Sequence, residues 1–253
     1  MIQSHYIDDR RIGDICILNG KDAFEVFNAD LKTFEPTSGT LSQNTLTAAG
    51  KSSFKVINQD FVQGELEVVF YVGGMSEDDK NLNCSRLLKE CKDVLIKREG
   101  DEFEYVSLLQ SFEVKDAGVD FWNTVTMKFS TIRRYGLITY HLQAGEYASQ
   151  QYRNISFVFN NEGTVESGLR FIIERAIGIS SMKINDITIT DIKADKKYVI
   201  DGIEGSVTVD GVNCFSQTNL IEFPKVKPGK NTVNIDILDY GEMWIEYYPT
   251  FML

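Results

Sequence analysis

Turn signals recur at short intervals between Tyr198 and Leu253, and they constrain the fold more than any other feature of the chain. Runs rich in Val, Ile, Thr and aromatic residues lie between dipeptides such as Asp210-Gly211 and Pro228-Gly229. Such runs are typical of β-strands, and these dipeptides are typical of the tight turns that join antiparallel strands. The stretch therefore predicts several short strands, and its last strand lies close to the C-terminus.

The same texture begins near residue 154 and predicts a β-sandwich domain, because many short strands separated by turn signals are typical of that architecture. The chain has 253 residues, which is enough for two domains. We place the first domain at 1–140, a polar linker at 141–153 and the sandwich at 154–253. Its strands are expected at 155–159, 169–177, 182–191, 198–209, 211–215, 231–237 and 242–249.

The sequence of the first domain predicts β-strands with one helix packed against them. Strand patterns cover 54–61, 64–74, 102–118 and 119–136. A helix is predicted over about 77–98, with Ser76 as its N-cap and acidic residues in its first turn. Its apolar stripe is formed by Leu87, Leu88, Cys91, Val94 and Leu95.

The first fifty or so residues are less clearly patterned. The segment 22–36 fits a short helix, a strand pair or an extended arm. The segment 37–53 is rich in Ser, Thr, Gly and Ala, so we interpret it as an exposed loop. A loop of this length inside a domain is usually functional or disordered.

The composition of the chain argues against binding to nucleic acid, membranes or metal ions. The formal net charge is −11, and an acidic surface disfavours stable binding to nucleic acid or to anionic membranes. No apolar run is long enough to insert into a membrane, and the N-terminus has no signal-peptide pattern. The four cysteines form no CxxC pair, so we expect buried thiols and no metal site.

We find no pattern of catalytic residues, and we expect no enzymatic activity and no cofactor. His5 and His141 lack a neighbouring nucleophile, and the chain has no Walker loop, GxSxG or HExxH motif. The acidic pairs, such as Asp78-Asp79, lie at predicted turns or helix caps, where solvation explains them.

Aromatic residues in the last strand are the most suggestive chemical feature. Trp244, Tyr247 and Tyr248 are candidate glycan contacts, because aromatic rings with a polar edge stack on sugars. The alternative, which we favour, is that Trp244 or the opposite face of this strand fills the sandwich core.

The segment FPKVKPGKNT and the closing MWIEYYPTF resemble the C-terminal half of siphophage distal tail proteins. Pro228-Gly229 suits the centre of a type II turn, and the Asn231 side chain can bond back to the turn backbone. The motif positions are Phe223, Pro224, Val226, Pro228, Gly229, Asn231 and Thr232.

The resemblance implies a mainly β fold, with an N-terminal β-sandwich or split barrel carrying the helix and a C-terminal galectin-like β-sandwich. It also implies a structural component of the virion tail tip. Copies would form a ring, usually a hexamer, that joins the tail tube protein to the baseplate or adhesion device. Further partners would be a tail-associated protein and a receptor-binding protein, and the loop at 37–53 would be an arm between subunits. The alternative function is an adhesin module that binds host cell-wall glycans through the second domain.

Overall fold

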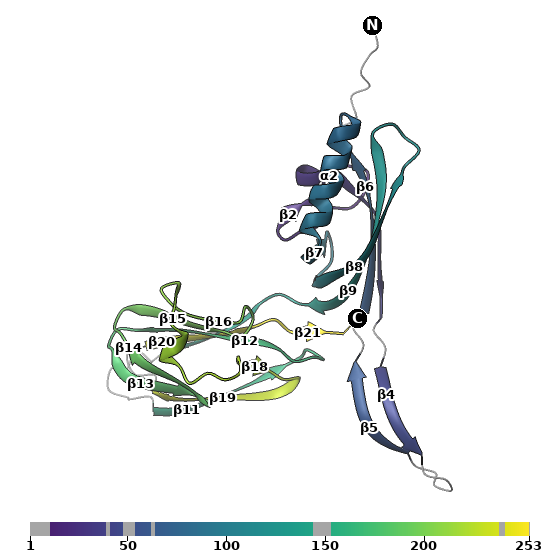
Figure 1. Ribbon diagram of the computed structural model, residues 1–253. Coiled ribbons are helices and arrows are strands. Elements are labelled where there is room, and N and C mark those ends of the chain that lie inside the picture. Colours follow the sequence, from purple (N-terminus) through teal and green to yellow (C-terminus); the bar gives the residue numbers. More distant parts are fainter. Residues whose placement is uncertain are drawn as a thin grey trace. The chain divides into compact units, whose positions relative to one another are not determined.

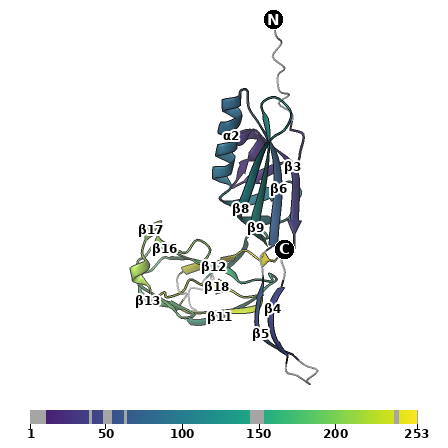
Figure 2. The ribbon, with the colours of Figure 1, turned by 45° about the vertical axis from the view of Figure 1, so that its right-hand side comes forward.

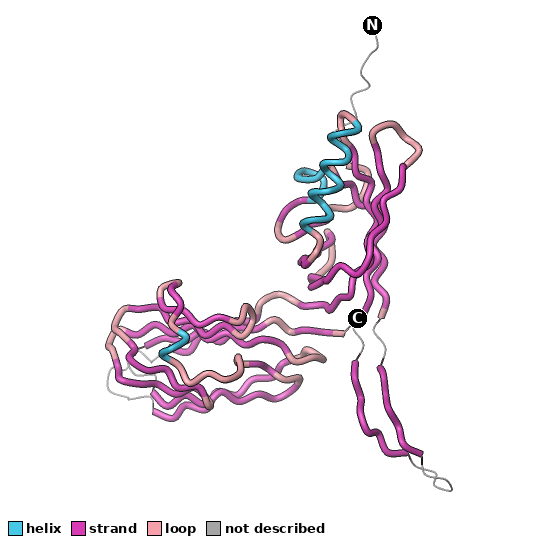
Figure 3. The backbone as a smooth tube through the Cα atoms, in the orientation of Figure 1, coloured by secondary structure: helices cyan, strands magenta, loops and turns pink. Residues whose placement is uncertain are grey.

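The computed structural model describes residues 11–38, 41–47, 54–61, 64–143, 153–237 and 241–252. They form two compact units: one extends to Arg134 and includes Met252, and the other runs from Tyr135 to Phe251. Strands dominate both units (Figure 3), so the chain is mainly β, as the sequence predicted.

The first unit is built on one antiparallel sheet with the strand order β2-β1-β7-β8-β9-β6-β3. Helix α2 (Glu77–Glu90) lies along one face of this sheet (Figure 2). The strands are β1 (Cys16–Leu18), β2 (Lys21–Asp22), β3 (Ala29–Thr37), β6 (Gly64–Gly73), β7 (Asp93–Arg98), β8 (Glu104–Asp116) and β9 (Trp122–Arg134).

Alternation of apolar residues explains the core of the first unit. In β6, Leu66, Val68, Phe70 and Val72 are fully buried and point to one face, as the period of two predicts. They pack in one cluster with Met127 and other inward residues of β9 and with buried residues of α2. The helix therefore completes a core that the sheet alone would leave exposed.

The sheet of the first unit curls so that its two ends approach each other. The ring of Phe34 in β3 contacts the ring of Tyr105 in β8 edge-on, with 5.0 Å between centroids. The buried Asp30 carboxylate in β3 accepts hydrogen bonds from the backbone N–H groups of Ile12 and Gly13, which precede β1. The resemblance implied a sandwich or split barrel here. The described residues form a single curled sheet, in which β3 at one end contacts the segment before β1 near the other end through Asp30 and not through strand pairing.

The helix predicted over about 77–98 is too long. Ser76 caps α2 as expected, accepting a hydrogen bond from the N–H of Asp79 at 3.2 Å, but the helix ends at Glu90. Residues 93–98 form β7, where buried Val94 and Ile96 alternate with more exposed neighbours. The apolar residues at 94–96 fit a strand period and a helix period equally well, and pairing with β1 and β8 selects the strand.

The N-terminal segments combine two of the predicted alternatives. Residues 22–37 contain a short helix, α1 (Ala23–Phe27), and then β3. The predicted loop at 37–53 is wrong where it is described, because β4 (Leu41–Thr47) pairs with β5 (Phe54–Phe61) in an antiparallel hairpin. A partner strand satisfies the backbone of a polar segment as well as it does that of an apolar one. The rest of that prediction, at 39–40 and 48–53, lies outside the described residues.

The second unit is a β-sandwich (Figure 1), as predicted for this part of the chain. One sheet has the order β10-β20-β12-β15-β16-β17, with β18 beside β12, and the other has the order β11-β19-β13-β14. The first sheet contains β10 (Ile138–Gln143), β12 (Ser167–Arg175), β15 (Lys196–Asp201), β16 (Ser206–Val209), β17 (Val212–Asn213), β18 (Lys225–Val226) and β20 (Gly241–Tyr247). The second contains β11 (Arg153–Asn161), β13 (Ile179–Ile184), β14 (Ile187–Ile192) and β19 (Gly229–Ile237). A short 3-10 helix, η1, spans Phe215–Gln217, and β21 spans Thr250–Phe251.

Turn residues separate these strands, and two of the predicted strands are hairpins. The stretch 182–191 turns at Asn185, and the stretch 198–209 turns after Asp201. Asn185, Asp195 and Asp210 all have positive φ, a conformation that Asn and Asp tolerate better than other side chains.

The predicted first-domain end and linker differ from the structure in one respect. Residues 138–143 form β10 and pair with β20 of the second unit. Ile138, Tyr140 and Leu142 pack against the sandwich core while the polar residues between them face outward, so the polar composition reflects an edge strand and not a linker. Positions 144–152 of the predicted linker lie outside the described residues.

All four cysteines are buried free thiols. Burial raises the pKa of the Cys91 thiol to about 12, so this group is a neutral core side chain at physiological pH.

The close approach of Gly13 to β3 gives a test of the curled sheet. A Cβ atom at Gly13 would lie 1.8 Å from the carbonyl oxygen of Leu31. We expect Gly13→Ala to lower the free energy of unfolding by about 1–3 kcal/mol, because the two backbone segments must separate. Urea denaturation measures this.

The matched control is Gly136→Ala, because a Cβ there would meet nothing within 4 Å. It is expected to stay within about 0.5 kcal/mol of the wild type. Equal effects of the two substitutions would contradict the close packing of Gly13.

Candidate ligand-binding face and exposed strand edge

The outer face of the larger sheet in the second unit carries side chains in three rows that run across the strands. Strand register sets these rows, since directly paired residues of an antiparallel sheet point to the same side. The central row consists of His141, Trp244, Ile172 and Val199.

Trp244 in β20 is half-buried in this central row. Its indole stacks on the imidazole of His141 in β10, with 4.7 Å between ring centroids and 4° between ring planes. The Nε2 atom of His141 lies 3.1 Å from Oε2 of Glu242, within hydrogen-bonding distance. The stacked pair of His141 and Trp244 is therefore linked to Glu242 in the neighbouring row of side chains.

Tyr247 cannot be the glycan contact that the sequence predicted. Its side chain points to the opposite side of β20 and is only 2% exposed. Its hydroxyl donates a hydrogen bond to the carbonyl oxygen of Asn160, and burial raises its pKa well above the ordinary value. Trp244 and Tyr248 are both half-buried, and their predicted contact with glycan stays a prediction.

One flanking row is an ion-pair network centred on Arg170 in β12. Its Nε donates to Asp201 at 2.7 Å, and its Nη1 donates to Glu246 at 3.3 Å. Partial burial by itself lowers the pKa of Arg170. The carboxylates of Asp201 and Glu246 together raise it by more, so the pKa lies above its ordinary value. Asp201 also accepts from the backbone N–H groups of Ile203 and Glu204. The network holds β12, β15 and β20 together on this face.

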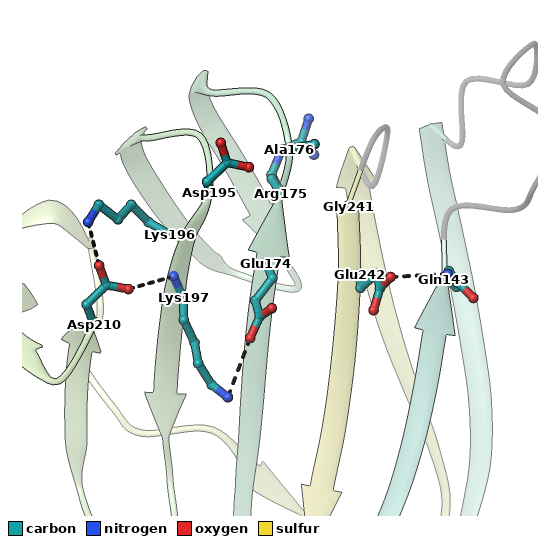
Figure 4. A pocket seen from close by; sticks show the side chains of 10 residues that line it. All are labelled: Gln143, Glu174, Arg175, Ala176, Asp195, Lys196, Lys197, Asp210, Gly241 and Glu242. Atoms are coloured by element: carbon teal, nitrogen blue, oxygen red, sulfur yellow. Dashed lines mark hydrogen bonds and ion pairs between the residues drawn. The ribbon is translucent and has the colours of Figure 1, made fainter.

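The other flanking row lines a cavity of about 580 Å³ (Figure 4). Gln143 donates to Glu242 at 3.1 Å, and the ammonium of Lys197 lies 3.5 Å from Glu174. The close-up shows these side chains on four neighbouring strands, together with the turn that carries Asp210. The remaining lining residues are Arg175, Ala176, Asp195, Lys196 and Gly241.

Asp210 holds the far side of this cavity in place. It accepts from the Lys196 ammonium at 2.6 Å and from the Lys197 backbone N–H at 3.0 Å. The hydrogen bond from Lys196 lowers the pKa of Asp210 below its ordinary value, so the carboxylate is ionised at neutral pH.

The residues of the FPKVKPGKNT segment lie in and around a turn. Gly229 has a φ of 81°, which favours glycine. The Asn231 side-chain amide donates to the carbonyl oxygens of Lys227 and Gly229, and its oxygen accepts from the Lys227 N–H. The Pro224 carbonyl accepts from the N–H of Leu169 in β12, and Phe223 packs against the core. The residues of this segment therefore stabilise the turn and its connection to β12.

In the first unit, β8 exposes a strand edge with apolar side chains. β7 covers this edge only over Tyr105–Leu108, and within the described residues no strand follows on that side beyond it. Leu108 and Phe112 are 54% and 56% exposed, and Val114 is also exposed. Phe112 and Val114 pair with Met127 and Val125, so they lie on the core-bearing face of the sheet but beyond its cover.

The described residues contain no group of three His, Cys, Asp or Glu side chains placed to hold a metal ion. No helix in the described part of the chain is long and apolar enough to cross a membrane.

Sequence reasoning missed the charged rows around Trp244. The alternation in β12, where Arg170, Ile172 and Glu174 lie between buried residues, was a usable signal that this strand has a polar outer face. The cavity itself required the pairing of β10, β20, β12 and β15, which no local pattern specifies.

No protein-family model matches this chain, and no curated protein matches it. Solved structures do share its fold. The Dit protein of phage SPP1, described as a paradigm of the hub adsorption apparatus in phages that infect Gram-positive bacteria, aligns with a TM-score of 0.63 and 14% identity, over 94% of this chain and 99% of that one.

Two structures of the phage P2 baseplate in its activated conformation also match. The structure with Ca aligns with a TM-score of 0.57 and the structure with Sr with 0.56. Both matches have 11% identity and cover 89% of this chain and 92% of the other. The likeness therefore extends over both units and shows a shared fold.

The Arg170 network gives a stability test. Arg170→Met leaves the buried Asp201 carboxylate without its guanidinium partner, and we expect a loss of about 1–2 kcal/mol in urea unfolding. Lys193→Met is the control, because Lys193 pairs with Asp191 at an exposed site and should leave stability unchanged. A loss as large for Lys193→Met would contradict a special role for Arg170.

Proposed function

We propose that this chain is a structural protein of a phage tail tip, located in the virion. Copies of it assemble into a ring of six that joins the tail tube to the baseplate or adhesion device. The observation that carries this proposal is the shared fold, which extends over 94% of this chain and 99% of the SPP1 Dit protein. The resemblance of the FPKVKPGKNT segment to distal tail proteins supports the same function independently.

The β8 edge supports self-association. An uncovered strand edge with neighbouring apolar side chains is a site at which another chain can pair or pack, and soluble proteins usually protect such edges. Phe112 and Val114 provide the apolar surface. Glu113 and Lys115 of the same strand form an ion pair, with 2.8 Å between the Lys115 ammonium and the Glu113 carboxylate. We assign this edge to contact with a neighbouring copy in the ring. A ring places different surfaces of each copy in contact, so every β8 edge would be covered once the ring closes.

The β4–β5 hairpin is the second element that we assign to the ring. Within the described residues, β4 and β5 pair only with each other and with no strand of the larger sheets. A two-stranded hairpin is marginally stable by itself in water. Packing against a neighbouring copy would stabilise it, so we propose that it is an arm between subunits.

The acidic composition suits a ring through which DNA passes. At a net charge of −11, the subunit repels the phosphate backbone more than it attracts it. The proposed partners are the tail tube protein, a tail-associated protein and a receptor-binding protein. We propose no catalytic role, since Glu174, Asp210 and Glu242 of the cavity are each engaged in an ion pair or a hydrogen bond with a neighbouring side chain.

The assembly can be tested with a substitution at the β8 edge. We expect the wild-type protein to form rings in negative-stain electron microscopy, with about six copies by native mass spectrometry. Phe112→Asp is expected to give monomers, because a carboxylate buried at the interface would lose its hydration.

Val158→Asp is the matched control. Val158 is 50% exposed and lies on β11 of the second unit, so the ring should persist in this variant. A wild-type protein that stays monomeric at high concentration would refute the ring. Rings that persist in Phe112→Asp would show that the interface lies elsewhere.

A further inference from the structure

Two loops bring exposed apolar side chains to one end of the sheet in the first unit. The turn between β8 and β9 carries Val119 and Phe121, and the loop before α2 carries Met75. Their exposed fractions are 63%, 43% and 88%, respectively. The N–H of Gly74 donates to the carbonyl oxygen of Phe121 at 3.1 Å, so the two loops lie side by side (Figures 1 and 2). We call Met75, Val119 and Phe121 the apolar end.

Phe121 has a backbone conformation that its residue type disfavours. Its φ is 63°, in the left-handed region, where a bulky residue is an outlier. Every other non-glycine residue with positive φ in the described part of the chain is Asn or Asp. Asn or Gly would form this turn with less strain. A phenylalanine here costs stability and leaves much of its ring in water, which favours a role in contact with another molecule.

Carboxylates surround the apolar end. All are exposed, and they are Asp116 and Asp120 in the β8–β9 turn and Glu77, Asp78 and Asp79 in the first turn of α2. Lys80, the only cation in 75–80 and 116–121, is buried, and its ammonium lies 2.8 Å from Glu77. The dipole of α2 accounts for the three carboxylates on the helix but not for Asp120 in the turn. The potential at this end is therefore negative and favours a cationic partner.

A second copy of this chain fits the apolar end poorly. The net charge of the chain is −11, so two subunits that meet at an acidic surface repel each other. Exposed apolar side chains that gather on a soluble protein and have a polar rim mark contacts with other proteins. A fitting partner supplies apolar side chains for Met75, Val119 and Phe121 and cations for the carboxylates around them.

We infer that the apolar end docks a segment of a different protein, in which apolar side chains are flanked by Lys or Arg. The apolar side chains pack on Met75, Val119 and Phe121, and the cations pair with the surrounding carboxylates. An apolar centre with a polar rim is the usual anatomy of a protein interface. This surface contains none of the residues assigned to the contact between copies at the β8 edge. The inference therefore goes beyond the proposed ring and does not depend on it.

A library of short random peptides, displayed on filamentous phage, is a probe of this chemistry. We expect the full-length protein to enrich peptides that combine Lys or Arg with aromatic or aliphatic residues. A synthetic peptide with the enriched sequence should bind with a Kd of about 100 μM or lower in isothermal titration calorimetry. Its Kd should rise at least about threefold between low salt and about 0.5 M NaCl, because salt screens exposed charges.

Substitutions then locate the site. Met75→Ser and Phe121→Asn are each expected to raise the Kd at least about fivefold, because they remove apolar contact at the centre of the interface. Asn tolerates positive φ, so Phe121→Asn retains the turn. Asp120→Asn should raise the Kd less and weaken its dependence on salt. Ile221→Ser is the matched control for Met75→Ser, because Ile221 is also highly exposed but lies in the second unit, and its Kd should equal that of the wild type. Circular dichroism checks the fold of each variant.

Three results would overturn the inference. One is an absence of enriched peptides, or enrichment without Lys and Arg. Another is a Kd that neither Met75→Ser nor Phe121→Asn changes. The third is the loss of rings in Met75→Ser by electron microscopy, which would make the occupant a second copy. A protein that binds these peptides as expected but forms no ring would refute the ring alone.

Discussion

Register between β12 and β20 determines most of the second unit. Three side chains of each strand are buried and directly opposite one another, so the pair forms the middle of the sandwich core. They are Leu169, Phe171 and Ile173 in β12 and Tyr247, Ile245 and Met243 in β20. A shift of either strand by one residue would turn its three core side chains toward solvent. The same register places Arg170 opposite Glu246 and Glu174 opposite Glu242 on the outer face, so the ion-pair network and the cavity follow from how the core is packed.

Burial also decides where the elements of the first unit end. α2 can cover only part of the sheet, and β7 pairs with β8 only as far as Leu108. β8 and β9 continue together beyond that point, which leaves Phe112 and Val114 on a face without cover. The exposed edge is thus a consequence of unequal element lengths. A monomer gains nothing from such a surface, whereas an oligomer can bury it.

The sequence was a good guide wherever a local pattern determines the structure. The Ser76 cap, the alternation in β6 and the turns around Asn185, Asp210 and Gly229 depend on neighbouring residues, and the structure contains each of them. What depends on distant partners was not predictable. Residues 41–47 and 138–143 look like polar loops until β5 and β20 pair with them, and 93–98 becomes a strand only because β1 and β8 flank it.

The strand β20 shows the same limit of sequence-based prediction within one candidate site. Alternation separates Trp244 from Tyr247, but the pattern alone does not say which side of the strand faces the core. The structure buries Tyr247 and places Trp244 on the outer face with His141 from the edge strand β10. Since β10 comes from a segment that reads as polar linker, the aromatic stack cannot be assembled from the sequence by pattern alone. The outer face and the β8 edge are made of different residues in different units. Under the proposed function, a change on the outer face would therefore leave the contact between copies at the β8 edge intact, because the two surfaces share no residue.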